Sequence, residues 1–105
     1  MAPKKHIVSE ITEFCAKLSA AKVVNIKSAY LFGSTARGTE RADSDIDVAI
    51  ISDSFTGFRY SDRARINPFV LKTNSKIEVH PFTVKEFNAA DPFVREILRT
   101  GKRVY

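Results

Sequence analysis

The feature that most constrains this chain is an apolar segment, residues 46–51, whose only charged side chain is Asp47 and which directly follows Asp45. A run of this length and composition predicts a buried strand. Side chains two residues apart on a strand point to the same face, so Asp45 and Asp47 are expected to project together at its beginning. Neighbouring carboxylates repel each other, and a cation between them removes that cost. Because oxygen ligands favour a hard divalent cation, we predict that Asp45 and Asp47 bind magnesium.

A glycine-serine turn precedes this strand. Residues 28–32 form a short run rich in apolar residues that ends at Gly33 and Ser34, which predicts a buried strand leading into a tight turn. Glycine permits close approach of the backbone to a ligand, and a following helical turn would aim free N–H groups at a phosphate. Ser34 adds a hydroxyl donor and Arg37 a guanidinium. Gly33, Ser34 and Arg37 are therefore predicted to bind phosphate groups.

A third carboxylate lies on the alternating segment 76–82, where Glu78 and His80 share one face. Pro81 predicts that this strand lies at a sheet edge or ends there. If the strand lies beside that of Asp47, Glu78 could ligate a second metal position and accept the proton of an attacking hydroxyl. His80 is expected to be solvated or hydrogen-bonded rather than a metal ligand. Each residue alone has an ordinary structural role, and it is their combination that indicates a nucleotide site.

The remaining elements are expected from apolar periodicity and from residues typical of helix boundaries. We expect an amphipathic helix at 5–22 and a short helix that Ser61 caps and Pro68 breaks or kinks. A capping box formed by Thr83 and Glu86 predicts a helix of one or two turns, and a further helix is expected to begin at Pro92 and end at Gly101. Val104 and Tyr105 are expected to form a final short strand or to dock on the body of the protein.

Length and composition limit the possible functions. Residues 1–105 are expected to form one domain with an open cleft rather than a deep cavity. The net charge of +5 favours anionic partners. No apolar run approaches the roughly 20 residues that span a bilayer, and the single cysteine, Cys15, cannot form an internal disulfide. We therefore expect a cytoplasmic protein without membrane contact. Cys15 is expected to be a small buried hydrophobe rather than a nucleophile.

The stretch GSTARGTERADSDIDVAI resembles the signature of the minimal nucleotidyltransferase (MNT) group of the DNA polymerase β superfamily, with its GS turn, small-Arg-Gly turn and Ser-Asp-x-Asp strand. The final segment FVREILRTGKRVY resembles the end of such chains. The resemblance implies an α/β (α+β) fold with a small mixed β-sheet flanked by helices, and it implies magnesium and a nucleoside triphosphate. By position it assigns Gly33 and Ser34 to phosphates, Asp45 and Asp47 to metal, and Glu78 to the third carboxylate, which is commonly aspartate in the superfamily.

The resemblance also suggests a partner. Many members of the group are described as antitoxins paired with a helical HEPN ribonuclease toxin, and some place AMP on a tyrosine of that toxin. The leading hypothesis is a magnesium-dependent adenylyltransferase that moves AMP from ATP onto a hydroxyl of a HEPN-type toxin, in a hetero-oligomer. One alternative is an antitoxin that silences the toxin by occlusion without turnover. Another is a nucleic-acid binder, which would bind with steep salt dependence and without metal; its candidate residues are Arg37, Arg41, Arg59, Arg63 and Arg65.

Overall fold

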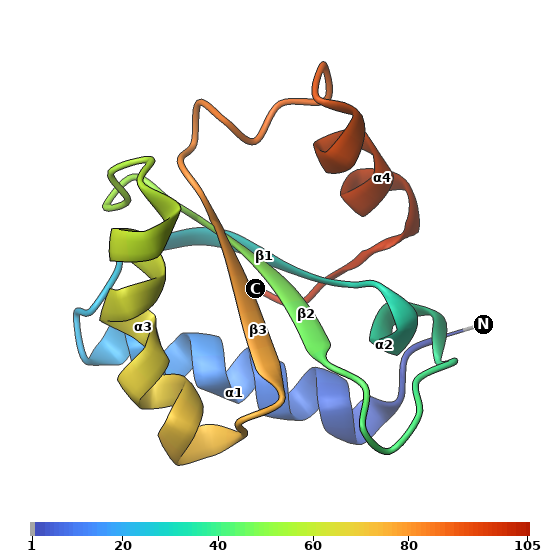
Figure 1. Cartoon of the computed structure of the whole chain (residues 1–105). Helices are drawn as coiled ribbons and strands as arrows, with labels where there is room; N and C mark the ends of the chain where they lie inside the picture. Colours follow the sequence, from blue (N-terminus) through green and yellow to red (C-terminus); the bar gives the residue numbers. More distant parts are fainter. Residues whose placement is uncertain (1) are drawn as a thin grey trace.

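The computed structural model describes residues 2–105 and contains four helices and four strands. In chain order they are α1 (Lys5–Ala20), β1 (Ile26–Phe32), α2 (Ser34–Arg37), β2 (Ile46–Ser52), α3 (Arg59–Thr73), β3 (Ile77–Phe82), α4 (Pro92–Thr100) and β4 (Lys102–Arg103). The strands form one sheet in the order β3-β2-β1-β4 (Figure 1). β1 is antiparallel to β2 and β4, whereas β2 and β3 are parallel. The expected mixed sheet with flanking helices is therefore confirmed.

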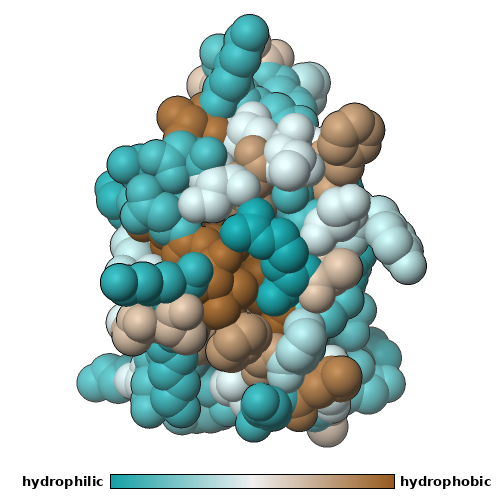
Figure 2. Space-filling model, turned by 90° about the vertical axis from the view of Figure 1, so that its left-hand side faces the viewer, coloured by the Kyte–Doolittle hydropathy of each residue, from teal (hydrophilic) through white to brown (hydrophobic). Residues whose placement is uncertain are grey.

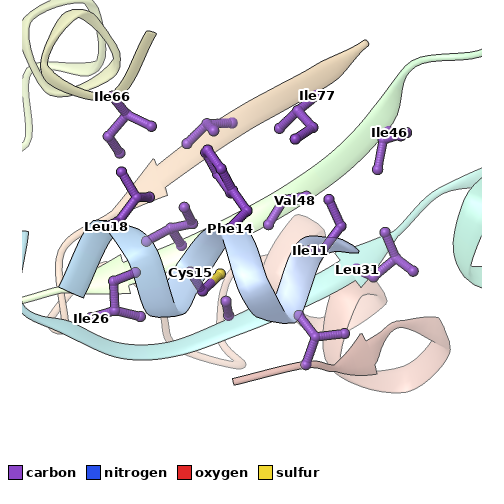
Figure 3. Packing of buried hydrophobic residues seen from close by; sticks show 14 of the residues in the cluster. Ile11, Phe14, Cys15, Leu18, Ile26, Leu31, Ile46, Val48, Ile66 and Ile77 are labelled. Carbon is purple, nitrogen blue, oxygen red and sulfur yellow. The ribbon is translucent and has the colours of Figure 1, made fainter. Parts of the chain in front are cut away.

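Strand β2 divides its apolar side chains between the two faces of the sheet. Val48 and Ile50 belong to the larger core, which α1 and α3 cover. Figure 3 shows the buried side chains of α1 lying against the strands on this face. Ala49 instead packs with Val94 and Ile97 of α4 in a smaller cluster on the opposite face. Because side chains alternate along a strand, Asp47 shares the face of Ala49, and α4 rather than the larger core borders it.

Helix α1 forms as its apolar periodicity predicts, but it ends at Ala20, two residues earlier than expected. Lys22 has a φ of 58°, in the left-handed region. The N–H of Lys22 donates to the Ser19 carbonyl at 3.0 Å, and that of Val23 donates to the Leu18 carbonyl at 3.1 Å. This pair of bonds is the Schellman arrangement that closes a helix, usually with glycine at the left-handed position. The sequence offered no glycine here to mark the end.

Replacing Lys22 by glycine is expected to raise the free energy of unfolding by about 1 kcal/mol, because a left-handed conformation is unfavourable for a residue with a Cβ. For a domain of this size, that gain raises the melting temperature by roughly 4–8 °C. Thermal unfolding followed by circular dichroism measures the change. Lys17→Gly, at an exposed helical position of α1, is the matched control and should destabilise the protein. Equal effects of the two substitutions would contradict the strain at Lys22.

Helix α3 corrects the prediction for this region. It begins at Arg59 rather than after Ser61, and it continues through Pro68 to Thr73. The buried Asp62 accepts hydrogen bonds from the N–H of Thr56 at 3.0 Å and of Gly57 at 3.0 Å, which fixes the loop that leads into the helix. A proline within a helix removes one backbone hydrogen bond. Burial of Ile66 and Val70 against the larger core, on either side of Pro68, compensates for that loss, and local sequence does not reveal this burial.

The other boundary residues act largely as predicted. β3 lies at a sheet edge, as Pro81 indicated. The Asp91 side chain accepts a hydrogen bond from the N–H of Phe93 at 2.8 Å and caps α4. Thr83 and Glu86 exchange the two hydrogen bonds of a capping box, but only a turn follows them, so the helix predicted there is wrong. The last strand, β4, precedes Val104, whose N–H donates to the Ala29 carbonyl of β1 at 2.9 Å, so the expected docking of the end is confirmed.

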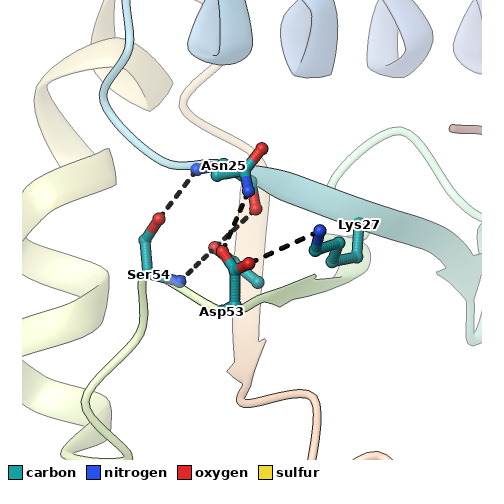
Figure 4. Close-up of polar contacts among 5 residues, drawn as sticks. Asn25, Lys27, Asp53 and Ser54 are labelled. Carbon is teal, nitrogen blue, oxygen red and sulfur yellow. Dashed lines mark hydrogen bonds and ion pairs between the residues drawn. The ribbon is translucent and has the colours of Figure 1, made fainter.

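Polar contacts tie the beginning of β1 to the end of β2 (Figure 4). The N–H of Asn25 donates to Ser54 Oγ at 3.0 Å, and its side-chain amide donates to Asp53 Oδ1 at 3.0 Å. Lys27 Nζ lies 3.4 Å from Asp53 Oδ2, and Ser52 Oγ donates to the Asn25 carbonyl at 2.7 Å. These contacts support the register of the two strands, which continues to the other end of the pair.

Within residues 2–105, no helix combines the length and the apolar character needed to cross a bilayer.

Candidate active site

The register of three neighbouring strands brings Asp47 beside Glu78. In β2, Asp47 lies opposite Phe32 of β1 on one side and opposite Glu78 of β3 on the other. The side chain of Asp47 is 27% exposed and that of Glu78 is 36% exposed, so both carboxylates reach solvent while their strands are packed below. The condition set for a third carboxylate, that its strand lies beside the strand of Asp47, is therefore met.

His80 completes a group of three potential ligands with these carboxylates. Asp47, Glu78 and His80 each offer one ligand atom, and the three atoms lie within 4.8 Å of one another. His80 Nε2 is 3.2 Å from Asp47 Oδ1 and 4.0 Å from Glu78 Oε1. Two carboxylate oxygens and one imidazole nitrogen form a donor set that suits a divalent cation. The residues present therefore fit a metal site.

Asp45 precedes the strand that carries Asp47 instead of lying within it. β2 begins at Ile46, whose N–H donates to the Lys76 carbonyl at 2.8 Å. Asp45 is exposed, and the three-ligand group found among residues 2–105 does not include it. It stands two residues from Asp47 at the open end of the strand, and its part in metal binding stays a prediction.

The turn before α2 lies directly against Asp47. Gly33 has a φ of 73° and a ψ of −155°, a backbone region that essentially only glycine occupies. A Cβ added to Gly33 would lie 2.6 Å from Asp47 Oδ2, so the close approach of the two residues also requires glycine. Ser34 begins α2 and is half-buried, whereas Arg37 at its end is exposed. The binding of phosphate by Gly33, Ser34 and Arg37 stays a prediction, now with Gly33 placed next to a potential metal ligand.

Aromatic side chains border the ligand group and hold the imidazole. The His80 ring packs edge-on against Phe32, with centroids 5.0 Å apart, and against Phe93 of α4 at 6.2 Å. Phe32 and Phe93 contact each other at 5.6 Å. Contact with both rings restricts rotation of the imidazole, whose Nε2 faces the carboxylates.

A cavity of about 460 Å³ lies elsewhere, between the beginning of α1 and the loop after α2, with Lys4, Glu40 and Lys76 among its lining residues. The group of potential metal ligands lies outside this cavity, so we place the candidate site at Asp47. Cys15 is buried in the core, and this burial raises the pKa of its thiol to about 12. A thiolate nucleophile is thereby excluded, and the prediction that Cys15 is a packing residue is confirmed.

Comparison with known proteins gives the family. A family model described as polymerase beta, nucleotidyltransferase, matches residues 10–105. The chain belongs to the polymerase β nucleotidyltransferase family. The match includes the glycine-serine turn and the strands of Asp47 and Glu78, so the resemblance noted in the sequence is confirmed and the chain carries a nucleotidyltransferase domain.

Solved structures agree with the fold of this family. A candidate nucleotidyltransferase from Sulfolobus solfataricus superposes with a TM-score of 0.60 at 20% identity, over 77% of this chain and 70% of that chain. A structure described as a toxin-antitoxin with AMP-PNP superposes with a TM-score of 0.63 at 20% identity, over 90% of this chain and 72% of that chain. At this identity the two structures support the fold alone. A comparison with curated protein sequences finds no match.

His80 is the residue whose place sequence reasoning did not foresee. It was expected to be solvated or hydrogen-bonded, and its contact with Asp47 Oδ1 confirms a hydrogen bond. Its position within reach of two carboxylates follows from the parallel pairing of β2 with β3, in which His80 lies opposite Ala49. The sequence did indicate that Glu78 and His80 lie on one face of their strand. It could not indicate that this strand pairs with β2, which is what brings His80 to Asp47.

Proposed function

We propose that this protein transfers AMP from ATP to a hydroxyl group of a protein partner, with a divalent cation bound at Asp47 and Glu78. The observation that carries the proposal is the position of Asp47, which lies opposite Glu78 on one side and against the Gly33 turn on the other. This arrangement could place the phosphates of a nucleotide beside a cation. The cation, magnesium in the sequence-based prediction, would supply stabilisation of negative charge on the triphosphate oxygens.

In the proposed reaction the acceptor oxygen forms a bond to the α-phosphorus of ATP. The bond from that phosphorus to the bridging oxygen of the β-phosphate breaks, and pyrophosphate leaves. Glu78 accepts the proton of the acceptor hydroxyl, Gly33 and Ser34 hold the phosphates through the backbone and a hydroxyl, and Arg37 adds a guanidinium contact. Asp45 is proposed as a further metal ligand with Asp47.

The partner is proposed from charge, surface and family resemblance. The side of the molecule that carries α3 mixes hydrophobic and hydrophilic side chains (Figure 2), with Phe58 and Tyr60 exposed at the beginning of the helix. The guanidinium of Arg59 lies 5.5 Å from the ring centre of Phe82, which is on the same strand as His80. This basic and aromatic surface lies at the end of β3, and with the net charge of +5 it favours an acidic partner. The resemblance of the sequence to the MNT group supports a HEPN-type toxin, and the likeness in fold to a structure described as a toxin-antitoxin is consistent with a toxin as the partner.

Incubation of the protein with its partner, ATP and Mg²⁺, followed by intact-mass measurement, tests the proposal. If the neighbouring reading frame encodes a short all-helical HEPN protein, that protein is the partner to use. We expect its mass to increase by one or more AMP units, and we expect no increase with Asp47→Asn. A stable complex without a mass change, together with a toxin that Asp47→Asn still silences, would favour occlusion instead.

Replacing Glu78 by glutamine should lower the transfer rate at least about 100-fold, because removal of a general base costs roughly this factor. The glutamine keeps the size of the side chain, and the fold should be unchanged because the side chain is partly exposed. ATP affinity should change less than the rate. Glu13→Gln, on the exposed face of α1, is the matched control. A wild-type rate in Glu78→Gln would leave Glu78 as an ordinary solvated residue.

A further inference from the structure

The imidazole of His80 faces the two carboxylates that the proposed function uses. Its Nε2 lies 3.2 Å from Asp47 Oδ1 and 4.0 Å from Glu78 Oε1, and its side chain is only 21% exposed. Within residues 2–105, the contact with Asp47 is the one hydrogen bond in which the His80 side chain takes part. The ring packs against Phe32 and Phe93, whose positions come from β1 and α4. The structure thus holds a nitrogen donor, His80 Nε2, beside two carboxylates whose oxygens alone are the kind of ligand that Mg²⁺ takes.

The chemistry of divalent cations gives this nitrogen a consequence. Mg²⁺ is a hard ion that takes oxygen ligands in near-ideal octahedral geometry. Divalent ions of the first transition series bind imidazole better and follow a common order of affinity for mixed nitrogen and oxygen sites. A site with one imidazole and two carboxylates should therefore favour these ions relative to a site with carboxylates only.

We infer that His80 is a third metal ligand and that it gives the Asp47–Glu78 site a preference for transition-series divalent cations, such as Mn²⁺, over Mg²⁺. The inference rests on the proposed function, because it concerns the cation of the same site. It adds a residue that decides which cation binds. A bound ion would take both side chains as ligands in place of the hydrogen bond between His80 and Asp47.

A different role for His80 would be to orient Asp47 by donating a hydrogen bond, without touching the ion. Metal ligands are commonly oriented in this way by outer partners. If His80 is a ligand, its nitrogen is bonded to the ion, and loss of the imidazole lowers the affinity for transition-series cations more than the affinity for Mg²⁺. If His80 only orients Asp47, no nitrogen is bonded to the ion, and the affinities for all cations fall equally. His80→Gln separates them, because glutamine retains an amide donor for Asp47 but removes the imidazole nitrogen.

Mn²⁺ itself is the probe for the experiment. Its binding to the intact protein is measured by electron paramagnetic resonance, and electron spin-echo modulation detects nitrogen bonded to the ion. Mg²⁺ affinity is obtained by competition. The chain has two histidines, so His6→Gln, at an exposed position of α1 away from the ligand group, is the matched control. We expect imidazole nitrogen modulation in the wild type and in His6→Gln, and its loss in His80→Gln.

The affinities give a second readout. Loss of an outer partner of a metal site typically costs about tenfold or more in affinity, and loss of a direct ligand should cost at least as much. His80→Gln should therefore weaken Mn²⁺ binding at least about tenfold and should change Mg²⁺ affinity much less. Mn²⁺ bound without nitrogen modulation, or an unchanged ratio of Mn²⁺ to Mg²⁺ affinity in His80→Gln, would overturn the role of His80 and leave the carboxylate site of the proposed function intact. Failure of both cations to bind the wild type would instead remove the cation site on which the proposed function depends.

Discussion

Replacing Asp47 by asparagine is expected to lower the rate of AMP transfer at least about 1,000-fold. Asp47 joins the parts of the candidate site: it lies opposite Glu78, 3.2 Å from His80 Nε2, and against the Gly33 turn. A metal ion contributes several kcal/mol to stabilising transition-state charge, and each 1.4 kcal/mol or so is a factor of ten in rate. The rate at which AMP mass appears on the partner measures the loss.

Two neighbouring substitutions make this prediction specific. Asp43→Asn, in the exposed loop before β2, changes the net charge by the same amount without touching the ligand group and should leave the rate within about twofold, as expected for a screened surface charge. Asp45→Asn should also reduce the rate if Asp45 closes around the cation with Asp47. An Asp47→Asn protein with wild-type transfer, folded by circular dichroism, would place the chemistry elsewhere on the molecule.

Replacing Gly33 by alanine is expected to abolish most transfer and to destabilise the fold. The added Cβ would lie 2.6 Å from Asp47 Oδ2, and the φ of 73° with a ψ of −155° is strained for any other residue. Residues held in such regions cost about 1–3 kcal/mol. Asp47 must therefore move or the turn must change, and either shift disturbs the carboxylate and the phosphate-binding backbone together. Chemical denaturation gives the stability, and the partner assay gives the rate.

Gly57 supplies the control for backbone strain alone. It has a φ of 94°, but a Cβ there would meet only Thr83 Cγ2 at 3.9 Å and neither Asp47 nor Glu78. Gly57→Ala should lose stability of the same order as Gly33→Ala while keeping its transfer rate once folded. If both variants lost activity in proportion to stability, the close contact of Gly33 with Asp47 would have no special role in the reaction.

The parts of the fold that local sequence determines could be predicted from the sequence. The Gly33 turn and the strand of Asp47 follow from residues that are adjacent in the chain, and so does the Asp91 cap of α4. The path of α3 through Pro68 could not be predicted, because buried contacts far away in sequence outweigh the local penalty of a proline. The early end of α1 was missed because Lys22 occupies a conformation that usually indicates glycine.

The candidate site divides in the same way. Asp45 and Asp47 were recognisable as a pair because they are two residues apart, yet only Asp47 joins the ligand group in the described structure. Glu78 depended on a condition, the pairing of its strand with β2, that only the structure could supply. The orientation of His80 depends on Phe93, which comes from α4, the helix after β3. Such contacts follow from long-range packing and leave no local pattern.

Isothermal titration of ATP into the wild-type protein tests most directly whether this face of the sheet is a cation-dependent nucleotide site. The titration is carried out with Mg²⁺, with Mn²⁺ and with EDTA, and it requires no knowledge of the partner. Because Asp47 and Glu78 place two negative side chains where the triphosphate would bind, we expect ATP to bind weakly in EDTA and markedly more tightly with either cation. Equal ATP affinity under all three conditions would contradict the proposed site.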